Sequence, residues 1–208
     1  MTTIHPPESR QTLRKQLRRA RRALSARQQR AAAQALARRL RTLLPLLRAR
    51  HIAFYLPNDG EIDPRPLVHF LEKLGKRCYL PRLYPGDNNR VWFVRYRHGD
   101  ALEDNRYGIP EPLLHGERLP AWAMQVVLMP LVGFDRAGNR LGMGGGFYDR
   151  TFAFKAGRKN GRPLLIGLAH SVQEVVQAEG ARHAVPLQAE PWDVPLDFIA
   201  TESFILRF

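Results

Sequence analysis

Short apolar runs, each separated from the next by helical or turn-rich segments, are the feature that most constrains how this chain can fold. The runs have the length and composition of buried strands, and they cover residues 51–56, 77–80, 91–94, 126–129, 164–168 and 198–201. Strands that alternate with helices predict an α/β fold, a three-layer sandwich with a largely parallel central sheet and helices on both faces. A chain of 208 residues can bury one core, so we expect a single domain, with its α/β core over 51–201.

The N-terminal part of the chain predicts a basic helical pair over residues 9–44. In the first helix, apolar residues recur at steps of four, three and four from Leu13, which gives one apolar stripe. Ser25 and Gln28 have the spacing of a capping box, so a second helix is expected to begin there. Pro45 is expected to end that helix, because a proline cannot continue the backbone hydrogen bonds.

Two later helices have recognisable boundaries. Asp63 followed by Pro64 is typical of a cap and a first helical residue. That helix is expected to end at Gly75, because glycine readily takes the left-handed conformation that follows a helix. Another helix is expected over residues 146–156.

The remaining segments are less regular. Ser171 and Glu174 predict a capping box for a short helix that reaches Ala178. Residues 99–123 lack a clear period and are interpreted as a long ordered loop, which in a compact domain is often functional. Residues 1–8 contain two prolines and are expected to be disordered.

The positive charge is concentrated at one end of the chain. The formal net charge is +14, and residues 1–50 contribute +13 of it, with Glu8 as their single acid. This segment could bind nucleic acid, act as an organellar transit peptide, attract anionic small ligands such as ATP and a folate, or form an ordinary solvated surface. No aromatic residue precedes Phe54, which excludes base stacking by this segment.

The single cysteine, Cys78, excludes an intramolecular disulfide and a cysteine-based metal cluster. It lies in an apolar run, so we expect a buried structural thiol in a reducing cytoplasm. The apolar runs are far shorter than the roughly 20 residues of a membrane span, so no membrane partner is expected.

A glycine-rich loop follows the apolar run at 126–129. After the turn residues 135–140, four of the next six residues are glycine, and Asp149 comes soon after them. A strand that leads through bare backbone into a helix can hold an anion on its N–H groups. The dinucleotide fingerprint fails because Phe147 replaces its third glycine, and no Walker lysine is present. A flexible turn is the alternative, but Arg140 before the glycines could bind a phosphate.

The stretch at 139–150, NRLGMGGGFYDR, resembles the signature of the 5-formyltetrahydrofolate cyclo-ligase family. Phe147 stands where that family usually has tyrosine, and Met143 stands where arginine or tyrosine is common. Further similar motifs follow the family order, from about residue 10 to residue 201. They are the basic N-terminal segment, EID at 61–63, GIPEP at 108–112 and DVPLD at 193–197.

The resemblance implies a reaction in which ATP and 5-formyltetrahydrofolate give 5,10-methenyltetrahydrofolate, ADP and phosphate. In that reaction the formyl oxygen is phosphorylated and the folate N10 then attacks the activated carbon. The chain is therefore expected to be an ATP-dependent cyclo-ligase with Mg²⁺ as cofactor. We also expect a monomer, a folate that can carry a polyglutamate chain, and no nucleic-acid partner.

The resemblance also implies roles for individual residues. Catalytic roles are implied for Arg14, Arg140 and Tyr148. ATP contacts are implied for Arg10, Gln11, Thr12, Leu13, Arg14, Arg140, Leu141, Gly142, Met143, Gly144, Gly145, Gly146, Phe147 and Tyr148. Folate contacts are implied for Leu56, Glu61, Met143, Gly144, Gly145, Gly146 and Phe147. Metal binding is implied for Asp149 and Asp193, whose hard oxygen ligands suit Mg²⁺.

Several of these residues have a simpler interpretation. Glu61 could be a surface acid before a helix, Asp149 could pair only with Arg150 or an N-terminal arginine, and Asp193 could be a turn residue. His170 follows a strand but has no partner in the sequence pattern, so we expect it to be structural. A different enzyme on a similar frame, such as a sugar-phosphate isomerase or an acyl-CoA transferase, is the rival enzyme class.

Overall fold

The computed structural model describes residues 10–86, 89–155, 161–175, 187, 190 and 192–208. The predicted disorder at 1–8 lies outside these residues. In the part of the chain that the structure describes, one sheet has the order β12-β11-β10-β7-β1-β2-β3-β6. Its strands in chain order are β1 (His51–Ala53), β2 (Arg77–Leu83), β3 (Val91–Arg95), β6 (Arg118–Leu119), β7 (Val126–Pro130), β10 (Leu164–Leu168), β11 (Phe198–Ala200) and β12 (Ile205–Arg207).

The sheet is largely parallel, as the sequence predicts. Strands β2, β1, β7, β10 and β11 run parallel to one another, while β3, β6 and β12 add antiparallel edges. Ile52 lies between Cys78 on one side and Val126 on the other. Strands buried on both faces need apolar residues at successive positions, which explains why these runs do not alternate with polar residues.

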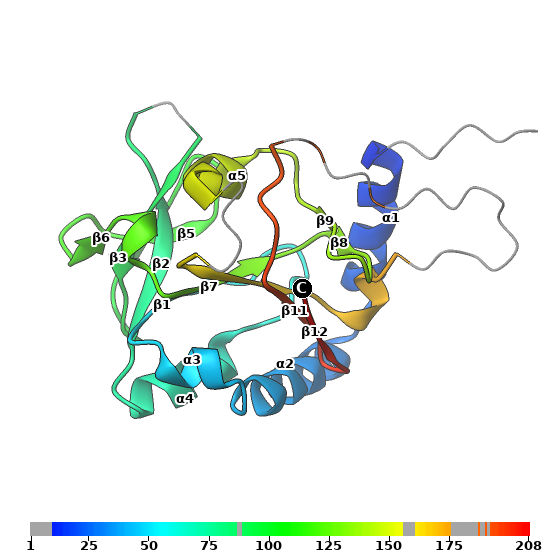
Figure 1. Cartoon of the computed structure of the whole chain (residues 1–208), viewed down its shortest axis with the longest axis horizontal. Helices are drawn as coiled ribbons and strands as arrows, with labels where there is room; N and C mark the ends of the chain where they lie inside the picture. The colour runs from blue at the N-terminus through cyan, green and yellow to red at the C-terminus, as the bar shows by residue number, and fades with distance from the viewer. Residues whose placement is uncertain (1–9, 87–88, 156–160, 176–186, 188–189, 191) are drawn as a thin grey trace, which may run out of the picture.

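Helices cover both faces of the sheet, which confirms the three-layer prediction (Figure 1). The helices are α1 (Arg10–Arg22), α2 (Ala26–Leu40), α3 (Leu44–Arg48), α4 (Arg65–Lys73) and α5 (Phe147–Phe152). Helices α2, α3 and α4 lie below the sheet in this view, α5 lies above it, and α1 stands at its side. The predicted capping box of α2 is present, because Ser25 and Gln28 each accept a hydrogen bond from the other's backbone N–H.

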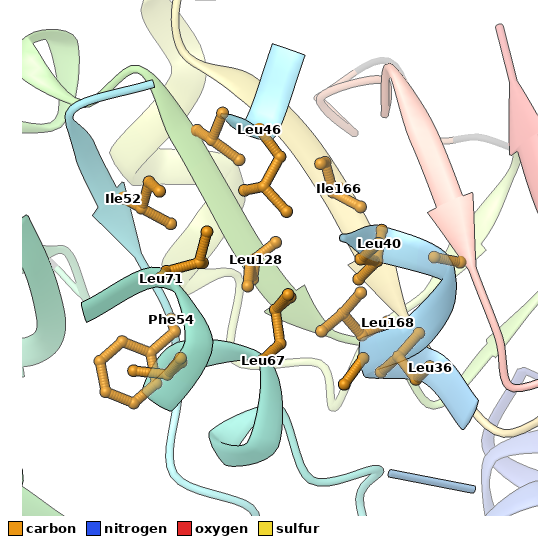
Figure 2. Close-up of a cluster of buried hydrophobic side chains, with 14 of the residues drawn as sticks. Leu36, Leu40, Leu46, Ile52, Phe54, Leu67, Leu71, Leu128, Ile166 and Leu168 are labelled. Atoms are coloured by element: carbon orange, nitrogen blue, oxygen red, sulfur yellow. The ribbon is translucent and has the colours of Figure 1, made fainter. Parts of the chain in front are cut away.

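Two hydrophobic clusters fix the sheet between its helical layers. Ile52, Leu128 and Ile166 point to the α2–α4 face, where they meet leucines such as Leu40 and Leu67 (Figure 2). The neighbouring strand residues Ala53, Val127, Met129 and Leu165 pack on the other face with Phe93, Phe134 and Phe152. Cys78 is fully buried in the first cluster, and burial raises the pKa of its thiol to about 12, so the predicted structural thiol is confirmed.

Helices α2 and α5 end earlier than the sequence predicts. The second helix ends at Leu40, and Pro45 lies in the first turn of the separate helix α3, where a proline loses no hydrogen bond. Helix α5 ends at Phe152 and continues as the short 3-10 helix η2 (Ala153–Lys155).

The predicted capping box at Ser171 and Glu174 is wrong. A 3-10 helix, η3 (Ser171–Gln173), begins after His170, and Gln173 accepts the His170 N–H through its side chain at 2.9 Å. The predicted continuation to Ala178 lies outside the described residues.

The segment at 99–123 is more regular than a loop. Strands β4 (Leu102–Asp104) and β5 (Pro110–Pro112) form a small antiparallel pair, and residues 118–119 join the main sheet as β6. The turn predicted at 135–140 closes a second small hairpin of β8 (Gly133–Phe134) and β9 (Arg140–Leu141). Strands of two or three residues are too short to show a period in the sequence.

The order of the strands locates the site. After β1 the chain passes through α4 on one face of the sheet and returns as β2, which lies next to β1 on the side away from β7. After β7 the chain passes through α5 on the other face and returns as β10, which lies next to β7 on the side away from β1. Strands β1 and β7 are neighbours, so the direction of winding changes between them. In open α/β sheets a crevice for ligands opens at this point, beyond the carboxyl ends of the strands.

Candidate active site

A cleft of about 750 Å³ lies beyond the ends of β1 and β7. Its walls come from α1, the loop after β1, the end of β7, the glycine loop, the β4–β5 pair and the segment near Asp193. The predicted site residues that line it are Arg10, Arg14, Leu56, Glu61, Arg140, Gly142, Met143, Gly144, Gly145, Gly146, Phe147, Tyr148, Asp149 and Asp193. Segments far apart in the sequence therefore meet in one cavity.

The glycine loop has a backbone that only glycine adopts without strain at two positions. Gly144 has φ +97° and Gly146 has φ +64°, in the left-handed region. Arg150 donates a hydrogen bond to the carbonyl oxygen of Gly145, and its guanidinium lies close to Gly146. This contact holds the Gly145–Gly146 peptide in one orientation. Because C=O and N–H point in opposite directions across a trans peptide, the Gly146 N–H points away from Arg150.

Arg10 and Arg14 of α1 reach the part of the cleft beside the glycine loop and Asp193. Arg14 donates to the carbonyl oxygen of Gly142 at 2.8 Å, and Arg10 lies 2.9 Å from Glu190 and 3.5 Å from Asp193. Burial, and then the nearby charge of Arg10, lower the pKa of the Arg14 guanidinium. A polyanion bound between these two arginines would relieve their mutual repulsion.

The acidic residues predicted as metal ligands are held by protein donors. Asp149 accepts from the Val194 N–H at 3.3 Å and forms an ion pair with Arg140 through the same oxygen. Arg140 also donates to the Val194 carbonyl at 3.2 Å, and its side chain is almost fully buried. Asp193 accepts from the Glu190 N–H at 2.9 Å, as a turn residue does.

Glu61 lies in the cleft with a partly fixed carboxylate. Its Oε2 accepts from the Asn58 N–H at 3.1 Å, and its Oε1 lies 3.7 Å from Nη2 of Arg21. Burial raises the pKa of Glu61 to about 7, although Arg21 and the Asn58 N–H oppose that rise. The surface-acid alternative does not describe this side chain, which is 12% exposed.

Arg21 and Asp59 are cleft residues that the sequence analysis missed. Arg21 is fully buried and donates to Leu131 O and to the Asp59 carboxylate and carbonyl. Its regular spacing after Arg14 and Arg18 was the available signal, but a charged face on a basic helix usually meets solvent.

Aromatic side chains form the remaining wall. Tyr148 stays protonated, because burial and then the nearby Glu61 raise its pKa. Phe147 lies edge-on to Tyr107, with ring centroids 5.9 Å apart, and both line the cleft near Leu56. Tyr107, in the segment expected to be a loop, was not among the predicted site residues.

Four of the predicted ATP-contacting residues do not line the cleft. Gln11 and Thr12 are exposed on α1, while Leu13 packs on a cluster that contains the fully buried Leu141. His170, expected to be structural, is buried and does not line the cleft.

The described residues lack two features that other binding proteins have. They contain no helix that is long and apolar enough to cross a membrane. They also contain no group of three or more histidine, cysteine, aspartate and glutamate residues with the geometry of a metal site.

Comparison with known proteins gives one consistent result. A model of the 5-formyltetrahydrofolate cyclo-ligase family matches residues 6–202. The chain is 39% identical over 188 residues to the 5-formyltetrahydrofolate cyclo-ligase of Escherichia coli (strain K12), covering 90% of this chain and 97% of that protein. It is 37% identical over 190 residues to the 5-formyltetrahydrofolate cyclo-ligase of Haemophilus influenzae, covering 91% of this chain and 95% of that protein.

Solved structures agree with these relatives. The fold is similar to the NMR structure of Aquifex aeolicus 5,10-methenyltetrahydrofolate synthetase, with a TM-score of 0.76, 30% identity, and coverage of 95% and 92% of the two chains. A Mycoplasma pneumoniae synthetase matches with a TM-score of 0.70, 25% identity, and coverage of 93% and 99%. The family match spans nearly the whole chain, and most of the signature residues line the cleft between β1 and β7. The chain therefore belongs to the 5-formyltetrahydrofolate cyclo-ligase family.

Proposed function

We propose that this cleft binds ATP and 5-formyltetrahydrofolate side by side and converts the folate to 5,10-methenyltetrahydrofolate, with release of ADP and phosphate. The observation that carries the proposal is that the glycine loop at 142–146 and the largely buried carboxylate of Glu61 line one cavity at the point where the winding of the sheet reverses. Family membership excludes the isomerase and transferase alternatives.

The chemistry needs alignment more than a protein nucleophile. The formyl group is an amide, and its oxygen is a poor leaving group. Transfer of the γ-phosphoryl group to that oxygen breaks the bond to ADP and makes the oxygen part of a phosphate. The folate N10 then attacks the formyl carbon, the carbon–oxygen bond breaks, phosphate departs, and N10 loses its proton. Placing two ligands in line, and stabilising the phosphoryl charge, can supply most of the acceleration.

The phosphates of ATP are assigned to the space between α1 and the glycine loop. Arg14 already contacts the loop at Gly142, and Arg10 lies beside it, so two cations face the exposed backbone of Gly144 and Gly145. Charge-assisted hydrogen bonds from arginine are strong and suit phosphate oxygens. The assignment of Arg140 as a direct phosphate clamp stays a prediction, because that side chain pairs with Asp149.

The pterin ring is assigned to the Glu61 side of the cleft. Pterin N–H groups are donors that a carboxylate accepts, and Leu56 and Phe147 supply apolar and aromatic surface for the ring. Tyr148 stays protonated and can donate a hydrogen bond rather than act as a base. A donor there could stabilise the formyl oxygen as its charge develops.

Mg²⁺ is assigned to Asp149 and Asp193. The donor set fits, since both are carboxylates that line the cleft, although each has one oxygen engaged by a backbone N–H. Magnesium usually takes one or two carboxylates and completes its shell with water and phosphate oxygens, so a larger protein cluster is not required. The ion would neutralise phosphate charge near Arg140.

The finer assignments concern the setting of the reaction. We place the enzyme in the cytoplasm, where a free thiol such as that of the buried Cys78 stays reduced. We also propose that it is a monomer. The exposed arginines of α1, such as Arg19, offer positive charge for a polyglutamate chain on the folate.

The direct test is the formation of methenyltetrahydrofolate, followed by its absorbance, with and without ATP and Mg²⁺. We expect product to form only when both are present, with one ADP and one phosphate per turnover. Turnover without ATP, or ATP hydrolysis without cyclisation, would contradict the proposal.

A further inference from the structure

Three arginines of α1 converge on the carboxylate of Asp59, in the loop after β1. Arg18 lies 2.7 Å from it, Arg21 lies 2.8 Å from it, and Arg22 also pairs with it. They differ in exposure: Arg21 is fully buried, while the side chains of Arg18 and Arg22 are 32% and 55% exposed. Burying the charge of an arginine costs free energy unless its donors are satisfied, so the contacts of Arg21 show what this burial achieves.

The backbone at Asp59 is strained. Asp59 has φ +53° and Gly60 has φ +76°, and the Glu61 N–H donates to the Asn58 carbonyl at 3.0 Å. This is a tight turn with two successive left-handed residues, of which only the glycine is at ease. The arginine contacts with Asp59 hold the turn in a conformation that brings Glu61 back toward Asn58.

Arg21 connects this turn to the cleft. Its Nε donates to the Asp59 carbonyl at 2.8 Å and its Nη1 donates to the Leu131 carbonyl at 3.1 Å, beyond the end of β7. Its Nη2 binds the Asp59 carboxylate and lies 3.7 Å from the Glu61 carboxylate. The guanidinium of Arg21 therefore bridges the loops that follow β1 and β7, where the winding of the sheet reverses. It also lies beside Glu61, the residue that is predicted to bind the folate.

We infer that Arg21 is a positioning residue, held by Asp59, that fixes the orientation of the Glu61 carboxylate and favours its charged form when it meets the pterin ring. The inference rests on the proposed function, because it assumes that Glu61 binds the folate. Arg22 shares Asp59 with Arg21 but has no described contact with Glu61, so it separates this role from the stability of the turn.

The groups that surround Glu61 set the direction of the test. Arg21 and Arg18 on α1 favour its charged form, whereas Asp59 on the same loop disfavours it. Tyr55 after β1 and Tyr148 on α5 also face it, but both stay neutral, because burial raises the pKa of each. Removing Arg21 should therefore raise the pKa of Glu61, and removing the charge of Asp59 should lower it.

The experiment measures kcat/KM for 5-formyltetrahydrofolate against pH, at saturating MgATP, in the full-length protein. For Arg21→Met we expect the acidic limb to move upward by about 1 to 3 pH units relative to wild type. Arg22→Met should leave the limb in place. Asp59→Asn, which keeps a residue that tolerates positive φ, should move the limb downward. Any ionisation of the substrate is common to all the proteins and cancels in the comparison.

Opposite shifts in the two variants support the inference, because loss of folded protein cannot produce them. A limb that stays in place in Arg21→Met, with equal losses in kcat/KM for folate and ATP, would show that Arg21 is only structural and overturn it. If Arg21→Met does not fold, Asp59→Asn decides the matter alone, and an unmoved or raised limb overturns the inference. Failure of the wild type to form methenyltetrahydrofolate would overturn the proposed function, and this inference with it.

Discussion

At the residue scale, the carboxylates Glu61 and Asp59 have opposite environments although they lie in one turn. Burial raises the pKa of Glu61 to about 7. Burial would also raise the pKa of Asp59, but hydrogen bonds from Arg18, Arg21 and Arg22 outweigh it and lower the pKa to about 2. Asp59 therefore stays negatively charged and keeps its three arginine partners, while the carboxyl of Glu61 titrates near neutral pH.

The raised pKa of Glu61 makes a stability prediction. The folded state holds the proton more tightly than the unfolded state, whose carboxyl has the ordinary value of 4.5, so stability falls as pH rises from about 4.5 to 7. Glu61→Gln removes this penalty, which the shift puts at about 3 kcal/mol. We expect the variant to be more stable than wild type at about pH 8, to lose that advantage at about pH 4, and to use folate poorly.

Denaturant unfolding at the two pH values measures the effect. Asp63→Asn is a suitable control, because Asp63 is near Glu61 in sequence but pairs with Arg65 at the start of α4. Equal stabilities of Glu61→Gln and wild type at about pH 8 would contradict the burial of a charge at this position.

At the element scale, long apolar runs were predictable and short elements were not. Strands such as β7 and β10 are buried on both faces, so composition alone identifies them. The two-residue strands β8 and β9 take their shape from hydrogen bonds with each other, which no local pattern encodes. The capping box predicted at Ser171 required Glu174 to bond back to that residue, whereas in the structure Gln173 bonds back to His170 and the 3-10 helix η3 begins one residue earlier than predicted.

The site followed the same rule. The glycine loop and Glu61 were predictable because each follows a strand, and the carboxyl ends of neighbouring parallel strands meet. The ion pair between Arg140 and Asp149 was not predictable. The two residues were interpreted separately, as a phosphate clamp and a metal ligand, and the partner expected for Asp149, if any, was Arg150 or an N-terminal arginine. Buried Arg21 was also missed, since its partner Asp59 is 38 residues away.

The glycine loop gives a matched pair of substitutions. Gly144 has φ +97° and its added methyl group would lie 3.7 Å from the Arg14 guanidinium, whereas nothing lies within 4 Å of a methyl group at Gly142. The added methyl group would only touch Arg14, but the positive φ should raise the KM for ATP in Gly144→Ala through backbone strain of about 1 kcal/mol or more. Gly142→Ala should behave like wild type. Steady-state kinetics with varied ATP distinguish them, and equal behaviour of both would remove the loop backbone from ATP binding.

At the scale of the whole molecule, the charge of the N-terminal segment is divided by position. Arg10 and Arg14 face the cleft, and Arg21 is buried beside it, but Arg27 and Arg30 lie exposed on α2. A phosphate clamp concentrates its free energy in the arginines that touch the ligand, whereas a nucleic-acid arm adds up contributions from all of them. The geometry favours the clamp.

The corresponding prediction compares arginines across the segment. Arg14→Ala should lower kcat/KM for ATP by about ten- to a hundredfold, since a charge-assisted contact contributes about 1.5–3 kcal/mol. Arg27→Ala and Arg30→Ala should leave the kinetics unchanged. The cyclisation assay and binding to duplex DNA are measured in parallel for all three. Equal losses of DNA affinity, with no change toward ATP, would contradict the clamp.

The central claim is that one cleft brings the γ-phosphate of ATP to the formyl oxygen of the folate. Transfer of the oxygen itself tests it most directly. The substrate is labelled with ¹⁸O in the formyl group, turned over with MgATP, and the released phosphate is analysed by mass spectrometry. Phosphorylation of the formyl oxygen predicts one ¹⁸O atom in each phosphate. Unlabelled phosphate, with the label released to water, would show that ATP drives the reaction in another way and would contradict the account.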